Sequence, residues 1–517
     1  MSKTYRCAST PNDCPEPIGL QDTIAEAMDI ISSHIDKSTS SSGTYRKPPI
    51  LISRLARGGK TTALLALFDR LKDDGKNVMF ISFNGSSNFM RLKEESEEEA
   101  FYRVIAAPLV DSNGYEGKVV PDWETLDRHI GVRPFVLLVD EINALSFPVS
   151  GKLSIILKKY FLDKANRFLV ISSHLPVDLE LEFNRESAGS LRSCEVLSLP
   201  TCTKIKLIRK MSDKCSHINV PTVAYYGGFP SLLYSRFQNE DFDPDQWFLR
   251  SKFAAVKSKN SFLPDFVDEL LEGQLRLTHA DIRGFDKLAS LRTIYVGGRK
   301  EQRIHWPLCY IHCILEQVVD PAAKEIVSLI SNLRFHQEHF DVGHGWEEIV
   351  KIAFLLRFVQ SANSGNAGPF ELCVRNEAIG ASVLTKPLGP DTLSVAEAKR
   401  DMDAELKKLT GTDGCYLVLF YPCQLRLKQF DGYVAFFKVA NGLSVTRRIV
   451  GYQCKAGKDG SDGRKPSWLH KAVLFRGKAT QKTTEKRDWV HASKEDVKEF
   501  LGFSLAMLYD LFNEDAA

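Results

Sequence analysis

The chain has 517 residues, of which 44% are hydrophobic and 26% are charged, and its formal net charge is +3 at pH 7. These values are ordinary for a globular protein, and the length suggests two or three domains. The longest uncharged apolar run, Cys415 to Leu425, is too short to span a membrane and contains Pro422. The N-terminal residues lack the apolar core of a secretory signal, and the 11 cysteines have irregular spacings. We therefore expect an intracellular protein with reduced thiols and no membrane partner.

The first half of the chain has the pattern of an α/β domain. Residues 1–45 carry few periodic patterns and end in a serine-rich stretch, so we expect a flexible lead-in there. In residues 46–235, apolar strands alternate with helical patterns, which predicts a parallel sheet with helices on both faces. The expected strands are Pro49–Ser53, Asn77–Phe83, Phe135–Val139, Arg167–Ser172 and Glu195–Leu199.

A glycine-rich turn lies between the first of these strands and a helical pattern. Its residues are Gly58, Gly59, Lys60, Thr61 and Thr62. This context predicts a P-loop that binds ATP, because glycines let backbone N–H groups converge on phosphates at a helix N-terminus. Lys60 would reach the β and γ phosphates, and the Thr61 hydroxyl would help to hold Mg²⁺. Arg54 stands where the usual pattern has a glycine, so hydrolysis could be slow or lost while binding survives.

An acidic pair ends a later expected strand, about 80 residues along the chain. Asp140 would hold Mg²⁺ through water, and Glu141 would polarise the attacking water. Gly-Lys-Thr alone is common, but its combination with a strand that ends in Asp-Glu favours a nucleotide site over a structural turn.

Three further features are compatible with a nucleotide-driven switch. The strand end Ser172–His174 could sense a γ-phosphate, and Arg185 or Arg192 could supply an arginine finger to a neighbouring subunit of a homo-oligomer. Residues 225–231 resemble the Gly-x-Pro element of signal-transducing ATPases with numerous domains. Strand ends, loops and turns often contain such residues, so each signal is weak by itself.

The second half of the chain carries a different set of polar residues. Residues 236–335 are mostly helical in pattern, which predicts a helical or winged-helix subdomain, and a new pattern begins in residues 336–517. There the expected helix Gly345–Phe354 carries Glu347 on its inward apolar stripe. A carboxylate in that position is costly unless it is paired or binds a metal ion.

The spacing of Asp431, Gln453 and Lys455 is that of restriction endonucleases. Gln453 and Lys455 are two residues apart on one expected strand and therefore share a face. Asp431 and Gln453, with the Cys454 carbonyl, would ligate Mg²⁺, and Lys455 would orient the attacking water. Glu347 could complete the metal shell. Gln453 replaces the usual acid, and the alternative is a buried Asp beside an ordinary edge strand.

The charge of the chain is concentrated near this motif. Between Gln424 and Asp488 there are 15 Lys and Arg against 5 Asp and Glu, a balance of +10 in a chain whose total is +3. Such a segment points to a phosphate-bearing partner, for which DNA is our expectation, or to a solvated basic surface.

Together the motifs resemble those of Crinkler-type proteins, which are related to the retrotransposon hot spot proteins of trypanosomes. The resemblance lies in the Ser53–Thr62 loop, the Asp140-Glu141 strand end, Gly-Gly-Phe-Pro, and the C-terminal Trp-Glu, Phe-Asp and Tyr-Gln-Cys-Lys motifs. It implies a P-loop ATPase joined to a restriction-endonuclease-like α/β domain, acting as an effector in a nucleus and possessing host-protein partners. The Leu-x-Leu-Phe-Leu-Ala-Lys header of many members is not found in this sequence.

The sequence thus favours an ATP-regulated, Mg²⁺-dependent nuclease that acts on DNA. The alternative is an ATP-gated module that binds nucleic acid or protein through an inactive nuclease fold. An ATPase motor is a third and less favoured interpretation.

Overall fold

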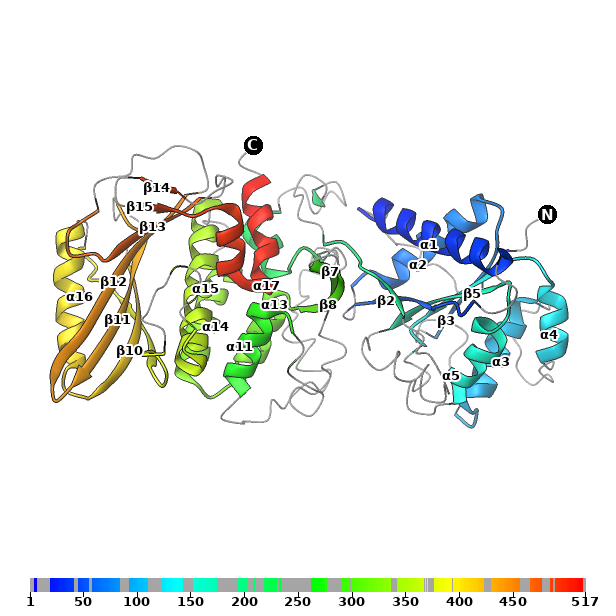
Figure 1. Cartoon of the computed structure of the whole chain (residues 1–517), viewed down its shortest axis with the longest axis horizontal. Coiled ribbons are helices and arrows are strands. Elements are labelled where there is room, and N and C mark those ends of the chain that lie inside the picture. Colours follow the sequence, from blue (N-terminus) through cyan, green and yellow to red (C-terminus); the bar gives the residue numbers. More distant parts are fainter. Residues whose placement is uncertain are drawn as a thin grey trace. The chain divides into compact units, whose positions relative to one another are not determined.

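The computed structural model describes most of the chain (Figure 1). The described residues are 4–6, 19–40, 45–54, 58–83, 93–109, 123–142, 152–173, 194–201, 208–209, 218–229, 232–233, 262–274, 276, 290–296, 299–335, 342–366, 368, 370, 376–392, 394–422, 429–455, 465–476, 484–486 and 489–514. Two compact units are present. The first unit comprises residues 1–202, 229–232 and 286–302, and the second unit comprises residues 203–228, 233–285 and 303–517.

The first unit is built on a parallel six-stranded sheet, which confirms the predicted sheet. Its strand order is β1-β3-β4-β5-β2-β6, and every neighbouring pair is parallel. The strands are β1 Thr4–Arg6, β2 Ile50–Ser53, β3 Asn77–Ser82, β4 Phe135–Asp140, β5 Arg167–Ser173 and β6 Glu195–Leu197. Parallel strands place all their carboxyl ends at one edge, so the polar residues that end β2, β3, β4 and β5 meet there.

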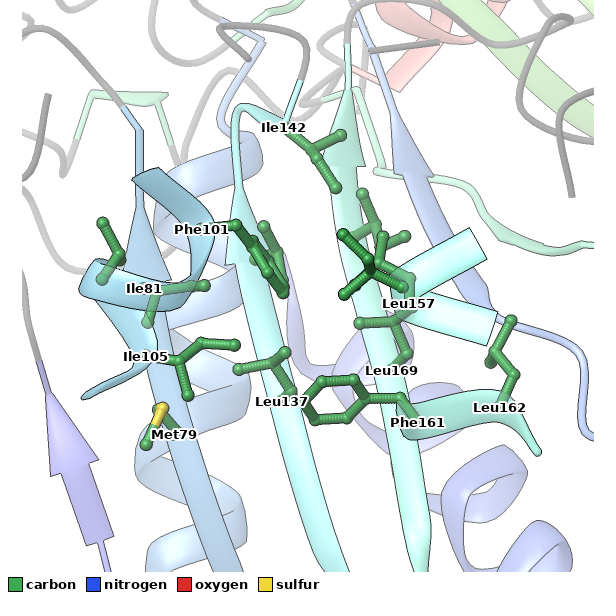
Figure 2. Packing of buried hydrophobic residues seen from close by; sticks show 14 of the residues in the cluster. Met79, Ile81, Phe101, Ile105, Leu137, Ile142, Leu157, Phe161, Leu162 and Leu169 are labelled. Atoms are coloured by element: carbon green, nitrogen blue, oxygen red, sulfur yellow. The ribbon is translucent and has the colours of Figure 1, made fainter. Parts of the chain in front are cut away.

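Both faces of this sheet are covered by helices (Figure 1). These helical elements are α1 Gln21–Ser40, α2 Lys60–Asp73, α3 Glu97–Leu109, α4 Trp123–Ile130, α5 Lys152–Leu157 and the π-helical segment η2 Lys158–Leu162. Alternate residues of strands β2 to β6 enter two separate cores, one against α1 and α2 and the other against α3, α5 and η2. Figure 2 shows the second core, in which Phe101 and Ile105 of α3 lie over Ile81 and Leu137 of the sheet.

The N-terminal segment contains structure that we did not predict from its sequence. β1 pairs with β3, and the 20-residue helix α1 buries Ala27 and Ile31 in the core beside α2. These apolar residues are spaced by four, so the helical period was present in the segment that we expected to be a lead-in.

The second unit contains a mixed seven-stranded sheet in the order β14-β15-β13-β12-β11-β10-β9. β9 runs parallel to β10. β11 runs antiparallel to both of its neighbours, β10 and β12. β13 runs parallel to both of its neighbours, β12 and β15. The strands are β9 Ser382–Pro387, β10 Gly414–Tyr421, β11 Gly432–Ala440, β12 Leu443–Lys455, β13 Lys471–Arg476, β14 Thr484–Lys486 and β15 Trp489–His491.

Two helices sandwich this sheet (Figure 1). Helix α16, Val395–Leu409, packs on one face through Met402 and Leu406. Helix α15, Val342–Ser364, packs on the other, where the rings of Phe354 and Tyr452 lie 4.7 Å apart. The unit also contains α8 Val220–Tyr225, α11 Phe262–Glu272, α13 Leu308–Leu315, α14 Pro321–Phe335 and α17 Lys494–Glu514.

A two-stranded sheet interrupts the region that we expected to be mostly helical. β7 spans Ser290–Val296 and pairs with β8, Arg299–His305. The Gly297-Gly298 dipeptide between them is a common hairpin signal, and it could have indicated this pair of strands. In the part of the chain that the structure describes, no helix has both the length and the apolar character needed to cross a membrane.

We expect Gly502→Ala to destabilise the second unit by about 1–3 kcal/mol, because it forces a side chain into a Gly-only backbone region. Gly502 interrupts α17 with φ 74° and ψ 173°, and a Cβ there would lie 2.6 Å from Leu271 Cδ2 and 2.7 Å from Leu271 Cα. Thermal unfolding measures the effect. Gly411→Ala is the control, since its Cβ would meet nothing closer than 4.0 Å, and equal melting temperatures for the two variants would contradict the prediction.

Candidate functional sites

The first site begins where β2 passes into α2. Gly58 is buried, and Gly59 adopts a left-handed conformation with φ 86° immediately before the first helical residue, Lys60. No Cβ-bearing residue adopts that conformation as readily. The turn therefore directs the N–H groups of the first turn of α2, which contains Thr61 and Thr62, out of the helix N-terminus.

Lys60 is buried, with 4% of its surface exposed, and its Nζ donates a hydrogen bond to the Arg54 carbonyl at 3.0 Å. Burial lowers the pKa of Lys60 to about 8, although the negative charges of Glu141 and Asp140 oppose the shift. The ammonium group is thus held at the loop in a poorly solvated position.

Asp140 is the centre of a hydrogen-bonded cluster at the carboxyl edge of the sheet. Its Oδ2 accepts from the Thr61 hydroxyl at 2.8 Å and from the Ser82 hydroxyl at 3.3 Å, and its Oδ1 accepts from the Ser172 hydroxyl at 2.6 Å. Burial raises the pKa of Asp140, while the hydrogen bonds from Ser172 and Thr61 favour its charged form. The juxtaposed hydroxyl and carboxylate oxygens of Thr61 and Asp140 are the donor type that Mg²⁺ prefers, so these residues fit that ion.

Glu141 leaves the strand in a strained conformation. Its φ is 52°, which is uncommon for a residue with a side chain, and its N–H donates to the Ser172 hydroxyl at 2.9 Å. Ser172 therefore fixes both acids, a role that the sequence did not suggest. Ser173 ends β5 beside it, whereas His174, Arg185 and Arg192 lie outside the described residues.

The structure explains why an arginine occupies position 54. Arg54 is buried, its Nη1 donates to the Pro200 carbonyl at 2.9 Å, and its guanidinium carbon lies 4.2 Å from the centre of the Phe229 ring. This is a cation–π contact. Phe229 belongs to the Gly-Gly-Phe-Pro element, so Arg54 connects that element to the loop whose carbonyl holds Lys60. No local sequence signal could have paired residues so far apart in the chain.

ATP affinity is expected to fall about tenfold between pH 7 and pH 9 because the pKa of Lys60 is about 8. The charged form binds phosphate, so affinity is full below the pKa and is lost as the pH rises through it. Titration calorimetry across this range measures the effect. Lys60→Arg, which stays charged throughout, should remove the pH dependence, and an unchanged slope in that variant would contradict this explanation.

The second site lies at one edge of the mixed sheet. Asp431 immediately precedes β11, its N–H donates to the Tyr452 carbonyl at 2.9 Å, and its Oδ2 accepts from the Cys454 N–H. Burial raises the pKa of Asp431 to about 6, although the Cys454 N–H and the charges of Lys351 and Lys455 favour the ionised form. Lys455 thus lies near enough to Asp431 for its charge to act on that carboxyl group.

The alternation of β12 separates the predicted residues into two groups. Tyr452 and Cys454 are buried and face α15, whereas Gln453 and Lys455 alternate with them and are half-buried. Gln453 shares a face with Lys455, as predicted, but that face is opposite to the one that α15 covers. Gln453 and Lys455 therefore both lie on the face of β12 away from α15, the helix that carries Glu347.

Helix α15 contributes more charged residues to this edge than we predicted. Glu347 is half-buried, and its charge acts on Tyr452 and Cys454, whose pKa values are raised first by burial. Glu348 and Lys351 are more deeply buried and were not identified from the sequence. In the described part of the chain, no group of three or more His, Cys, Asp or Glu side chains is arranged to hold a metal ion.

Comparison with known proteins gives only distant likenesses. No protein-family model and no curated protein matches the sequence. Among solved structures, a Thermotoga maritima RuvB mutant matches with 13% identity and a TM-score of 0.26, covering 45% of this chain and 64% of that one. Aeropyrum pernix Orc1 in complex with DNA matches with 12% identity and a TM-score of 0.27, covering 59% and 94%. Cdc6p from Pyrobaculum aerophilum matches with 14% identity and a TM-score of 0.29, covering 63% and 96%. All three scores are low, and none identifies a function.

Proposed function

We propose that the first unit binds ATP with Mg²⁺ and thereby controls the action of the second unit on DNA. The observation that carries the nucleotide site is the 2.8 Å contact between Thr61 and Asp140 beside the buried Lys60. Lys60 and Thr61 begin α2 and Asp140 ends β4. A strand–loop–helix with a basic residue at this position suits a triphosphate.

The residues of the chain can take complementary parts in ATP hydrolysis. Lys60 would exchange the Arg54 carbonyl for phosphate oxygens, while Thr61 and Asp140 would hold Mg²⁺. The ion, when bound, would neutralise charge on the phosphates. Glu141, whose N–H is held by Ser172, would accept a hydrogen bond from the attacking water and so orient that water.

Glu141→Gln is expected to lower ATP turnover about tenfold or more while leaving ATP affinity within about twofold, since general-base groups contribute rate rather than binding. Steady-state phosphate release and equilibrium binding of labelled ATP measure the two quantities. Glu124→Gln, an exposed change on α4, should alter neither. Equal turnover in Glu141→Gln and wild type would remove Glu141 from the mechanism.

For the second unit we propose Mg²⁺-dependent cleavage of phosphodiester bonds in DNA. Asp431 supplies a buried carboxylate, and Lys455 lies close enough to influence its pKa. Carboxylate, carbonyl and amide oxygens fit Mg²⁺, and the ion would stabilise charge on the phosphate. The mixed sheet flanked by α15 and α16 is compatible with a restriction-endonuclease-like domain.

A specific contact supports coupling between nucleotide and cleavage. Arg54, whose carbonyl accepts from Lys60, stacks on Phe229 of the first unit, and the preceding residue, Gly228, belongs to the second unit. A change at Lys60 on ATP binding could therefore reach the chain segment that joins the units.

The second candidate function is ATP-gated binding of nucleic acid or protein without cleavage. The position of Gln453 on the face away from α15, together with the loss of the usual acid there, favours this alternative. Cleavage of plasmid DNA by the wild-type protein with Mg²⁺ decides between them, because only the first candidate converts supercoiled DNA into nicked or linear DNA.

An ATP-binding unit that is followed along the chain by a nuclease unit is the arrangement that the resemblance to Crinkler-type proteins implies. On this resemblance we further propose a nuclear site of action, host-protein partners and assembly through the ATP-binding unit. Microscopy of the tagged protein and light scattering with and without ATP test location and assembly. An exclusively cytosolic or strictly monomeric protein would contradict the respective proposal.

A further inference from the structure

Two adjacent carboxylates on α15 have different surroundings. Glu347 is half-buried, whereas the Glu348 side chain is only 8% exposed. Glu348 Oε1 accepts a hydrogen bond from Lys351 Nζ at 2.7 Å, and the Lys351 side chain is also 8% exposed. Glu348 is therefore fixed by a buried ion pair within one turn of the helix.

The other carboxylate oxygen of this residue has a different environment. Glu348 Oε2 is buried and accepts no hydrogen bond from any residue in the described part of the chain. Leaving a buried acceptor unsatisfied is unfavourable, and more so when the group is charged. An oxygen held in that way is suited to a cation that the site is built to receive.

The Glu348–Lys351 pair belongs to the same edge of the sheet as Asp431. Lys351 Nζ lies 6.0 Å from the centre of the Tyr421 ring, at the end of β10, and its charge favours ionisation of Asp431. The charges of Glu348 and Asp431 both act on the buried Cys454, whose N–H binds Asp431. Glu348 on α15 and Asp431 at the sheet edge therefore both lie near Cys454.

Three carboxylates lie at this edge of the sheet, those of Glu347, Glu348 and Asp431. The positive charges of Lys351, Lys455 and His344 act on Asp431. Carboxylate oxygens select a hard divalent ion such as Mg²⁺ or Mn²⁺.

We propose that Glu348 Oε2, rather than Glu347, is the ligand that α15 supplies to a divalent cation shared with Asp431. Lys351 is a positioning residue, since it holds Oε1 and thereby turns Oε2 toward the ion. This assignment rests on the proposed function of the second unit and names the residue that completes its ion site.

Mn²⁺ binding to the full-length protein without nucleotide tests the assignment. Electron paramagnetic resonance of free Mn²⁺ gives the affinity of the protein for the ion. The Mn²⁺ binding that is lost in Asp431→Asn is assigned to the second unit and is called the Asp431-dependent component. We expect the affinity of this component to weaken tenfold or more in Glu348→Gln and in Glu348→Asp, and less than twofold in the matched variant Glu347→Gln. Thermal unfolding verifies that each variant is folded, and the two Glu348 variants guard against a folding defect in one of them.

The possible results separate this inference from the proposed function. Loss of the component in Glu347→Gln with its retention in Glu348→Gln would overturn the assignment and leave the Asp431 site in place. Retention of the Asp431-dependent component in both Glu347→Gln and Glu348→Gln would also overturn the assignment of Glu348 and leave the Asp431 site in place. If wild type has no Mn²⁺ component that depends on Asp431, both the assignment and the proposed ion site fail.

Discussion

Lys60→Ala is expected to abolish nucleotide binding, with an affinity for ATP about 100-fold or more below that of the wild type. Hydrogen bonds to charged groups contribute about 1.5–3 kcal/mol each. The loss of two phosphate contacts therefore corresponds to at least two powers of ten. Lys60 is buried at the helix N-terminus with no neighbouring lysine in the described part of the loop, so no other ammonium group there can replace it.

Lys72→Ala provides the matched control for this experiment. Lys72 lies on the same helix, α2, in its exposed last turn, and its loss should change ATP affinity less than twofold. Titration calorimetry with Mg²⁺–ATP measures both variants. Comparable affinities for Lys60→Ala and Lys72→Ala would mean that the loop does not bind triphosphate.

Asp431→Asn is expected to reduce DNA cleavage about 1,000-fold. A metal ion contributes several kcal/mol of transition-state stabilisation, and each 1.36 kcal/mol corresponds to a factor of ten in rate. The asparagine can still accept the Cys454 N–H that Asp431 binds, so the fold should survive while the negative charge is lost. The rate of plasmid nicking at saturating Mg²⁺ measures the effect.

Asp413→Asn is the control for this loss of charge. Asp413 is exposed and accepts the N–H groups of Asn441 and Gly442 at 3.0 Å, at the far ends of β10 and β11 from Asp431. It should cleave DNA within twofold of the wild-type rate. Wild-type cleavage that survives in Asp431→Asn would place the reaction elsewhere in the chain or in a contaminating nuclease.

Much of the first unit could be predicted because its strands β3, β4 and β5 are fully buried. Each of these three is a short apolar run between polar segments, and the expected strand Phe135–Val139 differs from β4 by one residue. The Thr61–Asp140 contact also follows from local pattern, since Thr61 lies in the first turn of the helix after β2 and Asp140 ends β4 at the same sheet edge. Helix α1 was not predicted, although its apolar residues recur at helical spacing, because its last turn runs into a serine-rich stretch that is typical of a loop.

The remaining site features depend on long-range packing that a single sequence does not reveal. Arg54 is explained only by Phe229, which the fold brings against it from a distant segment. Helix α15 is buried over most of its circumference, so its apolar stripe is too broad to show that Glu348 is more enclosed than Glu347. Their spacing places Gln453 and Lys455 on one face of the strand, but the sequence does not show which face of the strand α15 covers.

Cleavage of supercoiled plasmid by the wild-type protein, with Mg²⁺ and with ATP, ADP or no nucleotide, tests the central proposal most directly. We predict Mg²⁺-dependent nicking whose rate changes about fivefold or more with ATP, and no response to ATP in Lys60→Ala. Absence of cleavage under every condition, with ATP and DNA binding intact, would contradict the nuclease and leave the ATP-gated binding protein.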